Sequence, residues 1–148
     1  MTATGETITE GARNESPLWA ASLRPEPEWV PVFGELVPDA IALGLETVYE
    51  AYLVHYGRGR LFAPDDPDEA VLLGDYLYAH GLVRIADAGG VAAVAVMAEL
   101  IATCAALRAA GEQGDGDAWI EAVRGLGGAP DAAQISAAMS RHSARVAS

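Results

Sequence analysis

Apolar residues recur at every third or fourth position through the middle of the chain, and this spacing constrains the fold more than any other feature. After Pro38 the pattern consists of Ile41, Leu45, Val48, Tyr49, Tyr52, Leu53 and Tyr56. Gly57 then stands where a helix C-cap belongs. No strand-like alternation competes with this pattern, and no internal repeat is present. The sequence therefore predicts an all-α protein.

The same reasoning places further helices along the chain. Asp66 can cap a helix that has Pro67 at its first position, and the Gly89-Gly90 pair is expected to end that helix. The next helix is apolar almost all round, which predicts a central position in the core. The expected bundle contains about five helices, over residues 38–56, 67–88, 91–110, 118–124 and 130–146.

The chain is expected to have three parts. Residues 1–16 are polar without periodicity, which predicts a disordered tail. Residues 17–37 carry four prolines and form an expected strap over the core, anchored by Trp19, Leu23, Trp29 and Phe33. Residues 38–148 form the helical domain. An apolar fraction of 51% in 148 residues is enough for one globular core.

Charge excludes some classes of partner. The formal net charge of −12 would repel nucleic-acid phosphates and an anionic membrane surface, so neither is an expected partner. The stretch 91–107 is mostly Ala and Val with Glu99 near its middle, and it falls short of the ~20 strongly apolar residues of a membrane span. No span is therefore expected.

Cysteine usage and composition suggest a cellular setting. Cys104 is the single cysteine, so no internal disulfide forms, and a cytoplasmic location is expected. The first residues have neither a basic start nor an apolar stretch, so no secretory signal is expected. Every basic residue is Arg and Ala is abundant, which is typical of a GC-rich bacterial genome.

One helix carries a resemblance to a known family. Residues 72–79 read Leu-Leu-Gly-Asp-Tyr-Leu-Tyr-Ala and resemble the LxGDYL helix of the trans-isoprenyl diphosphate synthases, the polyprenyl synthetase superfamily. When Gly57 is set on the glycine of the family's Arg-Arg-Gly element, the family's Gly-Asp pair falls on Gly74-Asp75 without a gap. The similarity covers residues 39–124 and implies part of the isoprenoid synthase fold.

The same register shows what the chain lacks. The positions of the family's first DDxxD motif fall on Glu46, Thr47 and Glu50, and its Arg-Arg pair falls on His55 and Tyr56. The family's second aspartate-rich motif has no counterpart in this sequence. Ionising an allylic diphosphate requires several Mg²⁺ ions held by carboxylates of two facing helices. One helix with two glutamates cannot assemble that cluster, so catalysis by this chain alone is not expected.

The resemblance therefore implies an accessory role. The chain is similar to the small non-catalytic component I of heterodimeric long-chain prenyl diphosphate synthases. That similarity implies a larger catalytic subunit as partner, with Mg²⁺ present only through the partner and no cofactor of its own. In the family the Gly-Asp helix and the helix after it lie at or near the dimer interface.

Five residues are candidates for binding. Glu46 and Glu50 share a helix face and could hold one weak Mg²⁺, or form a solvated stripe opposite the tyrosines. Arg58 and Arg60 could bind a diphosphate or a partner's carboxylates, or be ordinary exposed loop residues. Asp75 lies in an apolar helix, so a buried carboxylate with a partner from another helix or chain is expected.

Other polar residues are expected to have no chemical role. The cluster 65–69 matches DDxxE, but its proline indicates a helix cap instead of a metal motif. The three histidines lack ligand spacing, so neither a metal site nor a catalytic residue is predicted. Cys104 is expected to be an inert buried thiol. The tyrosines could line a cavity or an interface, or simply pack in the core.

Three functions remain open. The first is the accessory subunit of a heteromeric polyprenyl diphosphate synthase. The second is a stand-alone helical module, monomeric or homodimeric, that binds a lipid or another protein. The third is a minimal homodimeric, Mg²⁺-dependent prenyltransferase or terpene-type enzyme that uses Glu46 and Glu50 or the cluster 65–69.

Overall fold

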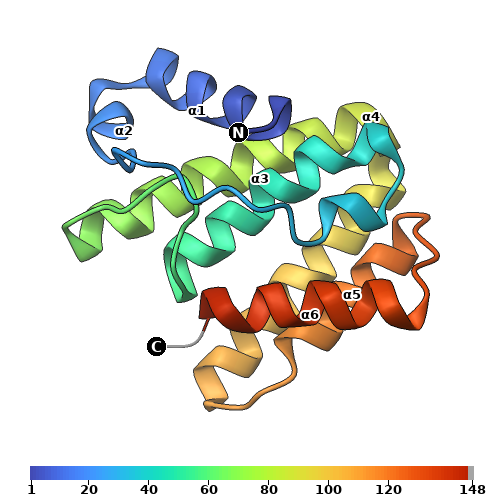
Figure 1. Ribbon diagram of the computed structural model, residues 1–148. Helices are drawn as coiled ribbons and strands as arrows, with labels where there is room; N and C mark the ends of the chain where they lie inside the picture. Colours follow the sequence, from blue (N-terminus) through green and yellow to red (C-terminus); the bar gives the residue numbers. More distant parts are fainter. Residues whose placement is uncertain (147–148) are drawn as a thin grey trace.

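The computed structural model describes residues 1–146, and this part of the chain contains helices and no strands (Figure 1). The all-α prediction is confirmed. The helices are α1 (Ala3–Glu15), α2 (Pro17–Ala21), α3 (Asp39–Tyr56), α4 (Pro67–Ala110), α5 (Asp115–Gly125) and α6 (Ala132–Val146), with a short 3₁₀ helix η1 (Gly34–Leu36). Five of the six α-helices have seven residues or more.

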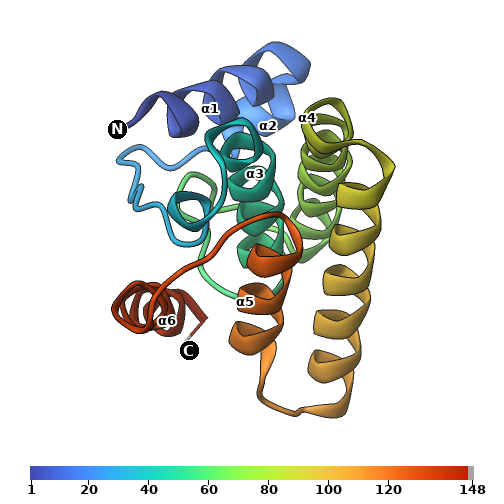
Figure 2. The same cartoon turned by 90° about the vertical axis from the view of Figure 1, so that its right-hand side faces the viewer.

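Helix α3 is the central element of the bundle. Its side chains are buried without a break from Leu45 to Leu53, because other parts of the chain cover every side of it. Helix α4 packs along its length, and α1, η1 and α6 contact its other sides (Figures 1 and 2). An apolar helix that includes two glutamates thus occupies the interior.

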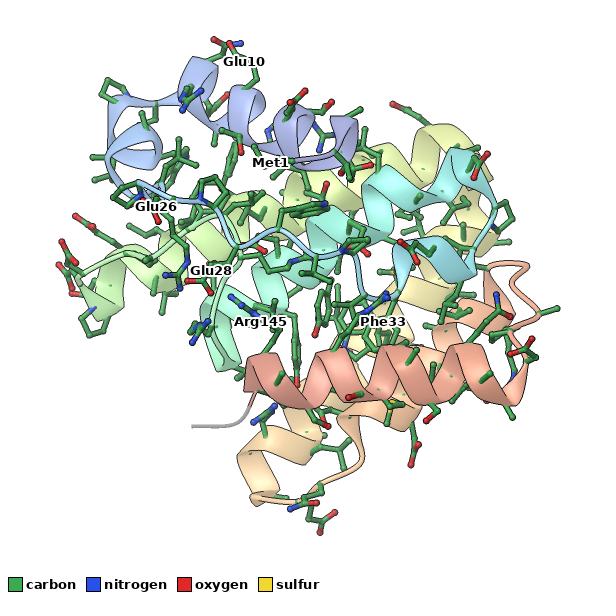
Figure 3. All side chains as sticks on the ribbon, in the orientation of Figure 1. Met1, Glu10, Glu26, Glu28, Phe33 and Arg145 are labelled. Carbon is green, nitrogen blue, oxygen red and sulfur yellow. The ribbon has the colours of Figure 1, made fainter. Side chains whose placement is uncertain are left out.

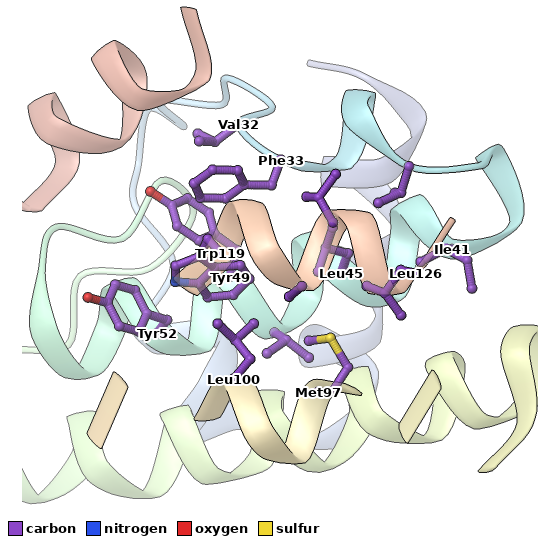
Figure 4. Close-up of a cluster of buried hydrophobic side chains, with 14 of the residues drawn as sticks. Val32, Phe33, Ile41, Leu45, Tyr49, Tyr52, Met97, Leu100, Trp119 and Leu126 are labelled. Carbon is purple, nitrogen blue, oxygen red and sulfur yellow. The ribbon is translucent and has the colours of Figure 1, made fainter. Parts of the chain in front are cut away.

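The core beside α3 is filled with aromatic rings (Figure 4). Phe33 stacks on Trp119 with ring centroids 5.3 Å apart, and the edge of Tyr49 meets Trp119 at 5.0 Å. Tyr52 contacts the same indole at 5.6 Å. These geometries are favourable for aromatic pairs. The rings of the tyrosines of α3 that enter the core therefore pack against other aromatic rings.

Helix α4 consists of two straight halves. Gly90 has φ 70° and ψ −165°, which is outside the helical region, so residues 67–89 and 91–110 run in different directions. The expected start of this helix is confirmed, because the side chain of Asp66 accepts a hydrogen bond from the backbone N–H of Asp68 at 2.9 Å. Gly111, at φ 68°, ends it as a left-handed cap.

The prediction that residues 91–110 are central is wrong. Only Ala93, Met97, Leu100 and Cys104 of this half are buried, and the opposite side faces outward at one edge of the molecule (Figure 2). An apolar composition shows that the side chains of this helix could be buried. Whether they are buried depends on which other elements cover the helix. By length and composition alone, α4 could cross a membrane, and only 22% of the residues in its most apolar stretch of 18 are buried.

The N-terminal segment also differs from expectation. Residues 3–15, expected to be disordered, form α1, which buries Ile8 and Ala12 against a second apolar cluster containing Phe62 and Leu77. The buried positions of α1, which are Gly5, Ile8, Thr9 and Ala12, have helical spacing and lie on one face of the helix. The following residues turn through α2, where the Ser16 hydroxyl accepts a hydrogen bond from the backbone N–H of Leu18, and then run as irregular chain to η1.

Candidate functional site

The two glutamates of α3 converge on one arginine. Glu46 and Glu50 lie one helical turn apart, and the loop after α3 turns Arg60 back onto them. Arg60 Nε donates to Glu50 Oε1 at 3.0 Å, and Arg60 Nη1 donates to Glu46 Oε2. All three side chains are almost completely buried. They form a cluster of two carboxylates and one guanidinium, which we call the Arg60 cluster.

Both carboxylates also accept backbone hydrogen bonds. Glu46 Oε1 accepts from the N–H groups of Val32 and Gly34 at 2.9 and 2.7 Å. Glu50 Oε2 accepts from the N–H of Leu61 at 2.9 Å. Each glutamate therefore ties a separate segment to α3: Glu46 holds the strap before η1, and Glu50 holds the loop that contains Arg60.

The guanidinium of Arg60 also forms hydrogen bonds with the backbone. It donates to the carbonyl oxygens of Val30 at 3.0 Å and Glu46 at 3.1 Å, and it lies 4.2 Å from the ring centroid of Trp29. Burial by itself lowers the pKa of Arg60, but the carboxylates of Glu46 and Glu50 raise it by more, so its pKa is above the ordinary value. The cluster is shielded from solvent.

This geometry corrects the expectations for Glu46 and Glu50. They form no solvated stripe, because the strap and the loop cover their side of α3. A metal ion could reach them only by displacing Arg60 and its hydrogen bonds. Within residues 1–146, no group of three or more His, Cys, Asp or Glu side chains is placed to hold a metal ion.

Arg58 and Arg60 have different surroundings. Arg60 is buried, which the sequence did not predict, whereas Arg58 is exposed and pairs with Glu28 of the strap. Arg145 of α6 donates to the same carboxylate oxygen at 2.9 Å (Figure 3). Hydrogen bonds from Arg145 and, to a smaller extent, from Arg58 lower the pKa of Glu28 to about 2. Glu28 thus joins the strap, the loop and α6.

Asp75 is not the buried carboxylate that was expected. Its side chain is 66% exposed, and its Oδ1 lies 3.7 Å from Nε2 of His55. The adjacent Gly74 has the structural role, because a Cβ at this position would collide with the His55 ring. The Gly-Asp pair therefore marks a close approach of α4 to α3, and the aspartate faces outward on that turn.

A polar network that the sequence did not predict lies where α3, α5 and α6 meet. Tyr49 Oη lies 2.7 Å from His142 Nδ1, and His142 Nε2 lies 3.3 Å from Asp115 Oδ2. The same carboxylate oxygen accepts from Tyr52 and, at 2.9 Å, from Arg108. Tyr49 and His142 are 93 positions apart, so no local pattern could have indicated this network.

Burial and neighbouring groups shift the pKa values of three members of this network. The contact with His142 Nε2, followed by hydrogen bonds from Tyr52 and Arg108, holds the pKa of Asp115 below its ordinary value. Burial raises the pKa of Tyr49 and of Tyr52, so both phenols stay protonated. A hollow of about 680 Å³ is lined by Arg108, Asp115 and His142, whereas the buried Tyr49 and Tyr52 are not among its lining residues. The network attaches α6 to the core.

Cys104 is buried, as the sequence predicted. Burial raises the pKa of its thiol to about 12, which leaves very little thiolate at neutral pH.

Comparison of the chain with protein-family models, with curated proteins and with solved structures finds no match.

Proposed function

We propose that this chain is a non-catalytic helical subunit that binds a larger protein through the outward side of α4. The resemblance of residues 39–124 to the prenyl synthases makes the catalytic subunit of a polyprenyl diphosphate synthase the proposed partner. The accessory chain then supplies a surface, and the partner supplies the metal ions and the chemistry.

The observation that carries this proposal is the exposure of α4. Large apolar side chains face outward on both halves, with Val83 60% exposed and Val91 87% exposed. Val71 and Leu72, near the start of the helix, are each 55% exposed. Isolated exposed apolar residues are common, but several on one helix indicate an interaction surface. Exposure of these apolar side chains to water is unfavourable, and a protein partner would bury them.

The Arg60 cluster argues against independent catalysis. The carboxylates at the positions of the family's first metal motif are Glu46 and Glu50, and both are bound to Arg60 and to backbone N–H groups. Releasing them for Mg²⁺ would leave a guanidinium buried without its counter-charges, which is costly. The aromatic rings beside α3 leave that part of the core filled.

Purification of the tagged chain from its native cells at endogenous level tests the proposal. Size exclusion followed by mass spectrometry is expected to recover a larger chain that carries an aspartate-rich motif. The purified chain alone is expected to turn over no allylic diphosphate with Mg²⁺, and addition of the chain is expected to lengthen the partner's products. Elution of the chain alone or only with itself would overturn the proposal.

A further inference from the structure

An apolar groove lies between the second half of α4 and α5. It has a volume of about 540 Å³, and Val96 and Leu100 form part of its lining. The remaining apolar lining comes from small residues, among them Ala95, Ala118 and Ala122. Small side chains on both walls allow another backbone to approach closely. The dimensions and lining suit the apolar side of a helix, which inserts side chains spaced three or four positions apart.

The groove carries negative charge at its edges. Glu99 of α4 and Glu121 of α5 both line it, and both are exposed. No Arg is among the lining residues. The nearest counter-charge is Arg124, which lies 3.7 Å from Glu121 in an exposed pair on α5. Glu99 is the one charged residue between Asp87 and Arg108, so it interrupts an otherwise uncharged helix.

This charge argues against a second copy of the chain as occupant. Two copies placed groove to groove would bring Glu99 and Glu121 of one against the same residues of the other. The net charge of −12 adds a general repulsion between copies. A helix that has Lys or Arg beside its apolar residues would instead form opposite-charge pairs at both edges.

We propose that the groove between α4 and α5 binds an apolar helix of a different protein chain, and that Lys or Arg residues flanking that helix pair with Glu99 and Glu121. This inference rests on the proposed function and specifies the chemistry of the partner. Apolar contact supplies most of the affinity. The two glutamates select the partner and exclude self-association.

Two synthetic peptides test the groove without the natural partner. Both are amphipathic helices of about 18 residues, long enough for appreciable helicity. They share the same Ala and Leu stripe, but one has Lys and Arg flanking it and the other has Glu. Added to the isotope-labelled full chain, the basic peptide is expected to shift the backbone amide signals of residues 95–103 and 118–125. The acidic peptide is expected to bind at least about threefold more weakly.

A pair of charge-reversal variants separates local recognition from general attraction. Glu99→Lys is expected to weaken binding of the basic peptide at least about threefold. Glu10→Lys, at an exposed position of α1, changes the net charge equally and is expected to have little effect on binding. Equal weakening by both variants, signal changes on another face, absence of binding at about 1 mM peptide, or a homodimer that blocks the groove would overturn the inference. These outcomes are independent of whether a prenyl synthase co-purifies.

Discussion

At the scale of single residues, Arg60 determines what the two glutamates of α3 can do. A pair of carboxylates at i and i+4 suits metal binding as well as it suits a buried ion cluster, and the spacing of Glu46 and Glu50 does not distinguish the two. The loop after α3 decides the outcome, because it places a guanidinium between the carboxylates. That contact depends on how a glycine-containing loop folds, which helical periodicity does not predict.

Replacement of Arg60 by methionine is expected to lower the free energy of unfolding by about 3–5 kcal/mol, because two buried carboxylates would lose their counter-charge. Urea denaturation followed by circular dichroism measures this loss. Arg58→Met, which removes an exposed arginine, is the matched control and is expected to cost about 0–1 kcal/mol. Similar losses in the two variants would contradict the structural role of Arg60.

Glu28 predicts a pH dependence of stability. Its pKa in the folded chain is about 2, below the ordinary value of 4.5, so ionised Glu28 stabilises the fold. This contribution is complete above about pH 4.5 and is lost as the pH falls toward about 2. The stability difference between the wild-type chain and Glu28→Gln is therefore expected to shrink over that interval. Urea titrations at several pH values measure it, and a constant difference would contradict the assignment.

At the scale of elements, glycines set how closely α4 packs on α3. A Cβ on Gly74 would collide with the His55 ring. A Cβ on Gly81 would meet the Val48 side chain at 2.5 Å and also the backbone nitrogen of Val48 at 3.0 Å. The sequence predicted the start of α4 from Asp66 and Pro67, because capping is local. It did not predict the position of residues 91–110, because burial depends on neighbours that are distant in sequence.

The two glycines are expected to respond differently to second-site changes. Gly74→Ala and Gly81→Ala are each expected to cost about 1–3 kcal/mol of stability through overpacking. His55→Ala is expected to restore much of the loss in Gly74→Ala, since the collision is with a side chain. Val48→Ala is expected to restore less in Gly81→Ala, since the backbone remains. Thermal and urea denaturation of the four single and two double variants measure this contrast, and equal rescue would contradict it.

The thiol of Cys104 reports on the packing of the second half of α4. Because the side chain is buried and its pKa is about 12, alkylation at neutral pH is expected to be very slow in the folded chain and fast in denaturant. Mass spectrometry after timed exposure to iodoacetamide measures the rates. Rapid alkylation without denaturant would show that this half of α4 separates readily from the core.

At the scale of the whole molecule, the buried polar and aromatic side chains beside α3 are bound to one another, whereas apolar side chains of α4 face outward. The Arg60 cluster and the aromatic core occupy the region where the family resemblance would place metal and substrate. The second half of α4 lies at one edge, away from α1 and α6 (Figure 2). The spacing of apolar residues predicted the helical class, but the location of the apolar surface required the three-dimensional packing.

Site-specific photo-crosslinking in native cells tests the central claim most directly. A photoreactive amino acid at Val83 or Val91 of α4 is expected to give a covalent adduct with one larger chain that carries an aspartate-rich motif, because these side chains face outward. The same group at Glu10 of α1 or Ala133 of α6, both exposed, is expected to give none. Adducts from all four positions alike, or none from α4, would contradict the account.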